Sequence, residues 1–142
     1  HIKITCAIPS NKRQIIVDTI NQITINEGFS QEFVWCLLNS KLINWYAYRF
    51  IFGKAIRTMQ FDNPTTEKIP IPKSVDKKTE QKIVSLVDEM LKLTKKYHDD
   101  KTLRKDKIKE EIKKTDQEID KLVYDLYGLT KEEIGIIEEG LR

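Results

Sequence analysis

The chain opens with apolar and polar residues in alternation. Apolar side chains recur at every second position from Ile2 to Ile8, until Pro9 ends the run. A period of two is typical of a strand with one buried face. Two more runs rich in β-branched residues, 13–20 and 23–25, follow turn-forming residues. The first 28 residues therefore predict a small antiparallel sheet of three short strands.

Residues 31–52 contain no glycine or proline and predict one long helix. Ser30 suits the N-cap position, and Gly53 supplies a C-terminal stop. Apolar residues lie on nearly every side of this helix, which is typical of an element inside a domain. We therefore expect its largest aromatic side chains to pack in the core, namely Trp35, Trp45 and Tyr46. Residues 53–61 fit either a strand or an ordered loop.

From about residue 76 the apolar spacing changes to steps of three and four. One apolar stripe runs from Ile83 to Tyr97 and a second from Ile108 to Leu126, as in a coiled-coil seam. A stretch dense in charge separates the two stripes. We expect two antiparallel helices, 76–97 and 103–127, with a bend between them. A single long helix is the alternative.

The end of the chain carries clear helix signals. Gly128 suits the end of the second long helix, and Thr130 with Glu133 has the spacing of a capping box. The predicted fold class is thus α+β, with a small antiparallel sheet packed on a buried helix, a coiled-coil-like hairpin and a short C-terminal helix. The proline-rich segment 69–72 must be extended. It divides a globular part, 1–74, from a hairpin region for spacing or dimerisation, 75–142.

Length and composition narrow the class of protein. The 142 residues suffice for one domain but not for two full ones. No apolar run approaches the roughly 18 residues of a membrane span, and none resembles a secretory signal. Two cysteines, Cys6 and Cys36, make no disulfide framework, so we expect a reducing, cytoplasmic setting. The chain begins with His1, which we interpret as a sign of a longer parent protein.

Charge is distributed unevenly. The formal net charge is +3, and residues 1–74 hold nine Lys and Arg against five acids. This surplus favours a polyanionic partner, because cations contact phosphates while polar donors on an ordered backbone read bases. The predicted DNA-binding residues are Lys12, Arg13, Arg49, Lys54, Arg57 and Gln60. The alternative is that these are ordinary surface cations near helix ends and turns.

The chain offers little that could catalyse a reaction. Its only histidines are His1 and His98, and neither has metal-ligand spacing to a cysteine or carboxylate. No glycine-rich loop follows a strand, so no phosphate or dinucleotide site is predicted. We therefore expect a non-catalytic chain without a cofactor or metal of its own.

Three blocks of sequence resemble a known family. Residues 33–46 (FVWCLLNSKLINWY), 68–72 (KIPIP) and 118–130 (EIDKLVYDLYGLT) occur in that order. They resemble the TaqI-like C-terminal specificity domain of type II restriction-modification enzymes, and the second block is also similar to a boundary in type I specificity subunits. The three blocks cover most of residues 30–137.

The resemblance implies a target recognition domain with a helical spacer. Such domains bind double-stranded DNA beside an adenine-N6 methyltransferase, and the S-adenosylmethionine site lies upstream in the same polypeptide. The family has no fixed base-reading residues, so the six predicted DNA-binding residues rest on charge and position. Besides DNA, the expected partners are the upstream methyltransferase domain and, through helices 76–97 and 103–127, a second copy of the chain. The alternative function is a helical-hairpin module that binds another protein, with an incidental basic face.

Overall fold

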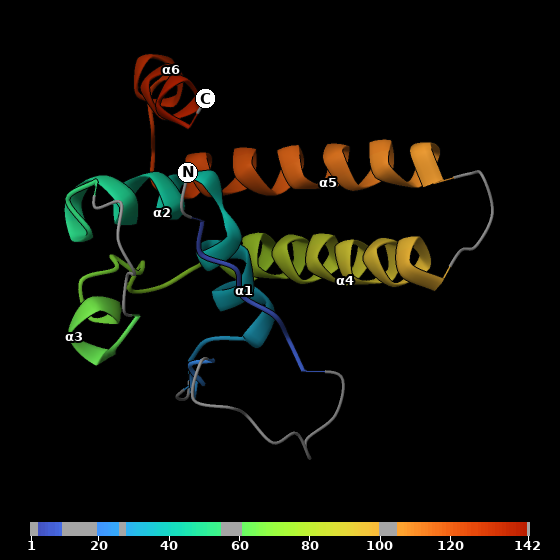
Figure 1. Cartoon of the computed structure of the whole chain (residues 1–142), viewed down its shortest axis with the longest axis horizontal. Helices are drawn as coiled ribbons and strands as arrows, with labels where there is room; N and C mark the ends of the chain where they lie inside the picture. Colours follow the sequence, from blue (N-terminus) through green and yellow to red (C-terminus); the bar gives the residue numbers. More distant parts are fainter. Residues whose placement is uncertain (1–2, 10–19, 26–27, 55–60, 100–104, 142) are drawn as a thin grey trace.

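The regular secondary structure of the described residues is entirely helical. The structure is a computed structural model, and it describes residues 3–9, 20–25, 28–54, 61–99 and 105–141. Figure 1 shows a group of shorter helices, which we call the head, and a long helical hairpin that projects from it. The elements are α1 (Gln31–Asn39), α2 (Lys41–Tyr46), the π-helix η1 (Ala47–Ile51), α3 (Asn63–Thr66), α4 (Lys77–Asp99), α5 (Lys105–Leu126) and α6 (Lys131–Gly140).

The predicted α+β fold with an antiparallel sheet is wrong, since no strand occurs among the described residues. Segment 3–9 keeps the predicted alternation, with its even-numbered residues half-buried and its odd-numbered ones exposed. Its backbone, however, bonds to side chains. The Asn39 amide accepts from the Cys6 N–H and donates to the Cys6 carbonyl, both at 3.1 Å. The Ile4 N–H donates to Asn44 Oδ1. Two asparagines on the first helices thus take the place of a neighbouring strand.

The other predicted strands have no counterpart in the described residues. Residues 20–25 form no strand, and Ile20 and Ile23 are exposed, so no buried face holds this run against a core. Most of the predicted strand 13–20 and part of the segment 53–61 lie outside the described residues.

The single predicted helix 31–52 is divided into three pieces. Ser40 has extended backbone angles, φ −65° and ψ 152°, so the chain turns between α1 and α2. The π-helix η1 then follows α2 without a gap. Gly53 and Lys54 both adopt left-handed angles, φ 56° and 58°, which ends the helix at the predicted place. The pieces have different neighbours: α1 mainly contacts α4, whereas α2 contacts α5 and α6.

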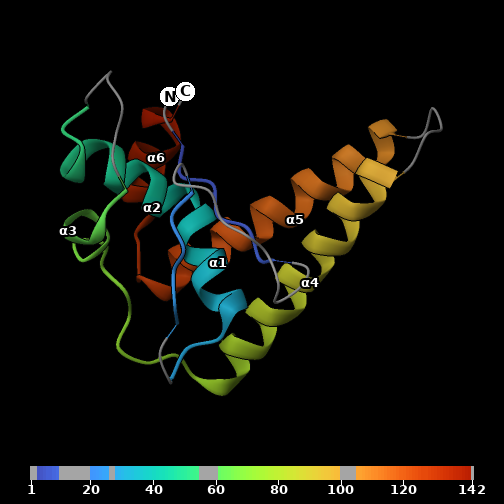
Figure 2. The same cartoon turned by 60° about the horizontal axis from the view of Figure 1, so that its bottom comes forward.

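The two long helices are present as separate elements, as predicted from the two apolar stripes. α4 and α5 lie side by side near the hairpin tip and diverge toward the head, where α1 contacts both of them (Figure 2). The apolar seam is buried between the two helices and, toward the head, against α1. The connecting residues 100–104 lie outside the described part. The fully or nearly fully buried apolar residues of the hairpin are Ile83, Leu86, Val87, Met90, Ile108, Ile119 and Val123.

The predicted end of α5 and start of α6 are confirmed. Gly128 has φ 66°, its N–H donates to the Asp125 carbonyl, and the Leu129 N–H donates to the Tyr124 carbonyl. These two bonds form a Schellman motif. Thr130 and Glu133 form the expected reciprocal capping box at the start of α6. Both helix ends could be predicted because the residues that form each motif are close together in the sequence.

One hydrophobic core joins the head to the base of the hairpin. α1 packs against α4, while α2 contacts α5 and α6. Phe33 and Cys36 of α1 are buried together with Val87 of α4 and Val123 of α5. Trp35 and Trp45 pack against the edge of this core. The head therefore sits on the hairpin base, and the rest of the hairpin extends away from it (Figure 2).

Candidate functional site

The break between α1 and α2 is a buried polar junction. Ser40 is only 1% exposed, and its hydroxyl donates to the Leu37 carbonyl at 2.7 Å while accepting from the Ile43 N–H at 3.3 Å. It therefore closes α1 and caps α2 with one side chain. Asn44, also buried, donates to the carbonyls of Leu38 and Ser40. The bonds of Ser40 and Asn44 fix the direction of the chain at Lys41, the first residue of α2.

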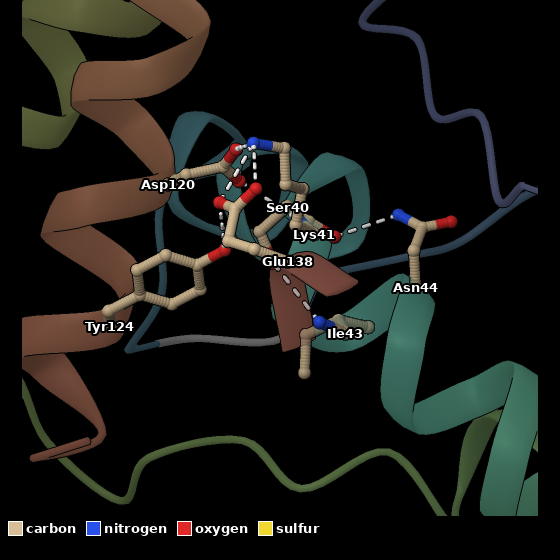
Figure 3. A network of polar contacts seen from close by, with 7 residues as sticks. All are labelled: Ser40, Lys41, Ile43, Asn44, Asp120, Tyr124 and Glu138. Atoms are coloured by element: carbon tan, nitrogen blue, oxygen red, sulfur yellow. Dashed lines mark hydrogen bonds and ion pairs between the residues drawn. The ribbon is translucent and has the colours of Figure 1, made fainter. Parts of the chain in front are cut away.

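Lys41 connects α2 to both α5 and α6 (Figure 3). Its backbone N–H donates to Asp120 Oδ1 at 2.8 Å, and its Nζ lies 3.2 Å from Asp120 Oδ2. The same Nζ donates to both carboxylate oxygens of Glu138, at 2.9 and 3.0 Å. The Tyr124 hydroxyl donates to Glu138 at 3.0 Å. We call Lys41, Asp120, Tyr124 and Glu138 the junction cluster.

The electrostatics of the junction cluster favour a fixed set of charges. Burial raises the pKa of Asp120, although the Lys41 N–H and ammonium oppose that rise. Burial would lower the pKa of Lys41, but its bond to Glu138 and the nearby Asp120 raise it on balance. Burial and these carboxylates also raise the pKa of Tyr124, so its hydroxyl stays neutral and donates. Because Lys41, Asp120 and Glu138 belong to α2, α5 and α6, the cluster holds these three helices in position relative to one another.

The three blocks that carry the family resemblance meet at this junction. Lys41 belongs to the first block, and its partner Asp120, 79 positions away, belongs to the third. Tyr127, also in the third block, donates its hydroxyl to the carbonyl of Pro70 in the second block at 2.6 Å. The blocks are therefore parts of a single structural unit that joins the head to the hairpin base.

The predicted DNA-binding residues are only partly placed. Lys12, Arg13, Arg57 and Gln60 lie outside the described residues. Arg49 belongs to η1 and Lys54 follows it, so these two share one corner of the head. Lys54 is exposed and sits on a left-handed backbone, which turns the chain sharply after Gly53.

Arg49 is held by an aromatic ring. Its guanidinium carbon lies 5.2 Å from the centre of the Trp45 ring, within cation–π range. Among the described residues, the buried Nε atom of Arg49 has no hydrogen-bond partner, and neither does Trp45 Nε1. Gly140, the last residue of α6, lies against both side chains. Arg49 is thus partly a packing residue, and Lys54 is the freer cation of the two.

An exposed aromatic residue completes this corner. Phe50 is 64% exposed, and its ring contacts Trp45 edge-on and Tyr46 at a tilt, with centroids 5.6 and 5.3 Å apart. We call Arg49, Phe50 and Lys54 the η1 corner. The sequence did not single out Phe50, because a helix that is apolar on all sides predicts burial for each of its aromatics. The π-helical turn rotates the residue outward, and no sequence signal announced that turn.

The junction carboxylates were also missed by sequence reasoning. Neither Asp120 nor Glu138 is among the candidate functional residues predicted from the sequence. Asp120 is in fact 4% exposed. Its position beside Ile119 on the apolar stripe was the available signal, because a carboxylate there must be paired when buried. Nothing local could have identified Lys41 as its partner.

Within the described part of the chain, no three His, Cys, Asp or Glu side chains come close enough together to share a metal ion. None of its helices combines the length and the apolar character needed to cross a bilayer. Comparison with protein-family models, with curated proteins and with solved structures found no match to the chain.

Proposed function

We propose that this chain is a sequence-specific DNA recognition domain from the C-terminal part of a restriction-modification protein. In this proposal it is a non-catalytic domain of a cytoplasmic enzyme. It positions an adenine-N6 methyltransferase, encoded upstream in the same polypeptide, on its target. S-adenosylmethionine belongs to that upstream domain.

The observation that carries the proposal is the meeting of the three resembling blocks. Chance matches to short sequence blocks would fall anywhere in a fold. Here the first and third blocks are joined by the Lys41–Asp120 pair, and the second and third by the Tyr127–Pro70 hydrogen bond. The resemblance therefore concerns one coherent unit, a head attached to a helical spacer.

The η1 corner is the described part of the proposed DNA interface. Lys54 supplies a solvated cation for a phosphate, and Phe50 offers an exposed ring beside it. Cations that follow the DNA backbone and an apolar side chain at the groove are recurrent partners in protein–DNA contacts. The proposed interface also includes Lys12, Arg13, Arg57 and Gln60, on grounds of charge and sequence position.

The hairpin suits the role of a spacer. Its apolar seam is buried between α4 and α5, and none of the large exposed apolar side chains of the described residues lies on either helix. The exposed ones are Ile20, Ile23, Phe50, Ile71 and Ile136. A hairpin that satisfies its own seam holds a fixed shape and needs no second copy to cover it.

Fluorescence anisotropy with a labelled random-sequence duplex at two salt concentrations tests the proposal. We expect affinity to fall steeply with salt, because each phosphate contact releases counterions. Lys54→Gln should weaken binding and make the salt dependence shallower by about one unit of slope. Lys73→Gln, which removes an exposed lysine from the extended segment before α4, is the charge-matched control.

The competing function is a module that binds another protein. The exposed Phe50 and Ile136 favour it, since exposed apolar side chains are common at protein interfaces. Absence of duplex binding even at low salt would support this function and overturn DNA recognition. Equal loss of DNA affinity in Lys54→Gln and Lys73→Gln would contradict the proposal that the η1 corner contacts DNA.

A further inference from the structure

Residues 92–109, around the end of the hairpin, have a higher net positive charge than the whole chain. Between positions 92 and 109 the sequence has eight Lys and Arg against three Asp, a net of +5, whereas the full chain has +3. We call the described residues of this segment, 92–99 and 105–109, the hairpin tip. Every lysine in it is exposed. All other residues of the chain together are therefore slightly acidic.

Three cations of the hairpin tip share one surface. Lys92, Lys95 and Lys96 follow one another at helical spacing, on the side of α4 opposite its buried seam, and they line a shallow hollow with Asp99. On α5, Lys105 Nζ lies 5.3 Å from the centre of the Tyr97 ring, which belongs to the seam side of α4. The hairpin tip therefore carries cations on both sides, and the largest group lies on the outer side of α4.

These lysines have no carboxylate partners in the described part of the chain. The ion pairs found there all involve Lys41 of the junction cluster. Lysines held at helical spacing repel one another. A surface that keeps several of them together without pairing is complementary to a polyanion.

The position of the hairpin tip adds a geometric argument. The tip and η1 lie at opposite ends of the long axis of the molecule (Figures 1 and 2). α4 alone, with 23 residues, is about 34 Å long at 1.5 Å per residue. One turn of B-DNA measures about 34–36 Å. Because η1 lies beyond the head end of α4 (Figure 1), two cationic ends held apart by this helix match phosphates one helical turn or more apart on a straight duplex.

We propose that the hairpin tip binds the phosphate backbone of the duplex whose target sequence the head reads, one helical turn or more away from the η1 corner. The inference rests on the proposed DNA-recognition function. It adds a second, sequence-independent contact to that function. A continuous polyanion satisfies both ends at once, which an acidic patch on a compact protein partner does not.

The test compares duplex lengths and matched variants of the 142-residue chain. Anisotropy is measured with labelled random-sequence duplexes of about one and about three helical turns. We expect the longer duplex to bind at least tenfold more tightly per site. The triple variant Lys92→Gln, Lys95→Gln, Lys96→Gln should lose this advantage and two to three units of salt slope, at about 0.9 per phosphate.

The control is the triple variant Lys77→Gln, Lys78→Gln, Lys82→Gln. It removes the same charge from the same outer side of α4, at the end next to the head. We expect it to keep the length dependence. Thermal melting of both variants should match that of the unmodified chain, because all six lysines are exposed.

The outcomes separate the inference from the proposed function. Binding that is salt-sensitive but equal on both lengths would overturn the tip contact and leave DNA recognition standing. Equal losses in the two triple variants would also overturn it, since net charge alone would then explain the effect. Absence of binding to either duplex would overturn both proposals.

Discussion

At the scale of single residues, Asp120 connects α5 to Lys41 of α2, 79 positions away in sequence. One of its oxygens accepts the Lys41 N–H at the start of α2, and the other lies 3.2 Å from the ammonium that also binds Glu138 of α6. The residue is nearly fully buried, whereas the side chain of Lys41 is one-third exposed. A buried carboxylate without these partners would be costly. Asp120 is therefore tolerated because both of its oxygens face Lys41 of α2.

Asp120→Ala should lower the free energy of unfolding by about 2 kcal/mol, because it leaves the Lys41 N–H unsatisfied and removes one partner of the ammonium. Asp120→Asn keeps an acceptor for that N–H, so it should lose about half as much. Urea denaturation measures both values. The exposed Asp125 of the same helix is the control, and its replacement by alanine should change stability by less than about 0.5 kcal/mol. Equal effects at the two positions would contradict a structural role for the junction cluster.

Asn39 has a comparable role for the N-terminal segment. Its amide satisfies both backbone groups of Cys6 and also donates to the Trp35 carbonyl of its own helix at 2.9 Å. With Asn44, it gives segment 3–9 hydrogen bonds that would otherwise come from a sheet. The segment is therefore attached at a few points and should detach when one is removed.

Asn39→Ala should release the segment around Cys6 while the core stays folded. Burial raises the pKa of both thiols, that of Cys36 to about 12. Thiolate formation limits reaction with disulfide reagents, so Cys36 should react very slowly and Cys6 faster. In the variant, the Cys6 rate should rise several-fold with the Cys36 rate unchanged. A parallel rise at both thiols would indicate global destabilisation and contradict this assignment.

At the scale of whole elements, the features that the sequence predicted are those set by local spacing. The two apolar stripes predicted α4 and α5, and the Thr130–Glu133 pair predicted the start of α6. Such signals involve residues within one or two helical turns. The period of two in segment 3–9 was equally genuine. It indicated a strand because it reports one buried face, while the partner that covers this face is set by distant residues.

The division of 31–52 into α1, α2 and η1 illustrates the same limit. Ser40 is a good N-cap, but it lies within a run that otherwise favours one continuous helix. The break is stabilised by a contact to Asp120, 79 positions away in sequence from Lys41. Likewise, the junction cluster and the exposed Phe50 depend on tertiary packing. No pattern within a single helix contains that information.

The start of α4 gives a prediction for pH. Asp76 Oδ1 accepts from the N–H groups of Lys78 and Thr79, and bonds from Thr79 hold the pKa of this carboxyl below its ordinary value. A lowered pKa in the folded state means that the ionised carboxylate stabilises α4. That contribution is complete above the ordinary aspartate pKa of about 3.9 and is lost as pH falls through the folded-state pKa.

Asp76→Asn keeps a capping oxygen but has no charge to titrate. At neutral pH we expect the unmodified chain to melt at a higher temperature than the variant, because a negative charge is favourable at a helix N-terminus. The difference should shrink as pH falls below about 4. Thermal melts followed by circular dichroism between pH 7 and pH 3 measure it. A difference that stays constant over this range would contradict the stabilising charge.

At the scale of the whole molecule, the two proposed DNA-contacting surfaces lie at the ends, and the contacts that stabilise the fold lie between them. The junction cluster and the shared core fix the head on the base of the hairpin. The η1 corner and the hairpin tip then face solvent at opposite ends of one framework. Two surfaces can contact DNA at a fixed distance from each other only if the structure between them is rigid. The junction supplies that rigidity through its buried members, Ser40, Asn44 and Asp120.

The docking of α6 on α2 closes this framework, and its two glycines provide a matched test. A Cβ atom at Gly140 would lie 2.6 Å from Trp45 Nε1 and 2.8 Å from Arg49 Nη2, whereas one at Gly135 meets nothing within 4 Å. Gly140→Ala should therefore force the helices apart and destabilise the chain by about 1–3 kcal/mol. Gly135→Ala, within the same helix, should stabilise it by up to about 1 kcal/mol through helix propensity.

Urea denaturation followed by tryptophan fluorescence measures both changes, and Trp45 reports directly on the contact. In Gly140→Ala the Arg49 side chain can move aside, but the half-buried Trp45 ring is held by its neighbours. The loss should therefore come with a shift in native-state emission that Gly135→Ala does not show. If the two alanine variants were equally stable with identical emission, α6 would not be packed against the η1 corner, and the rigid link between the two proposed contact surfaces would lose its basis.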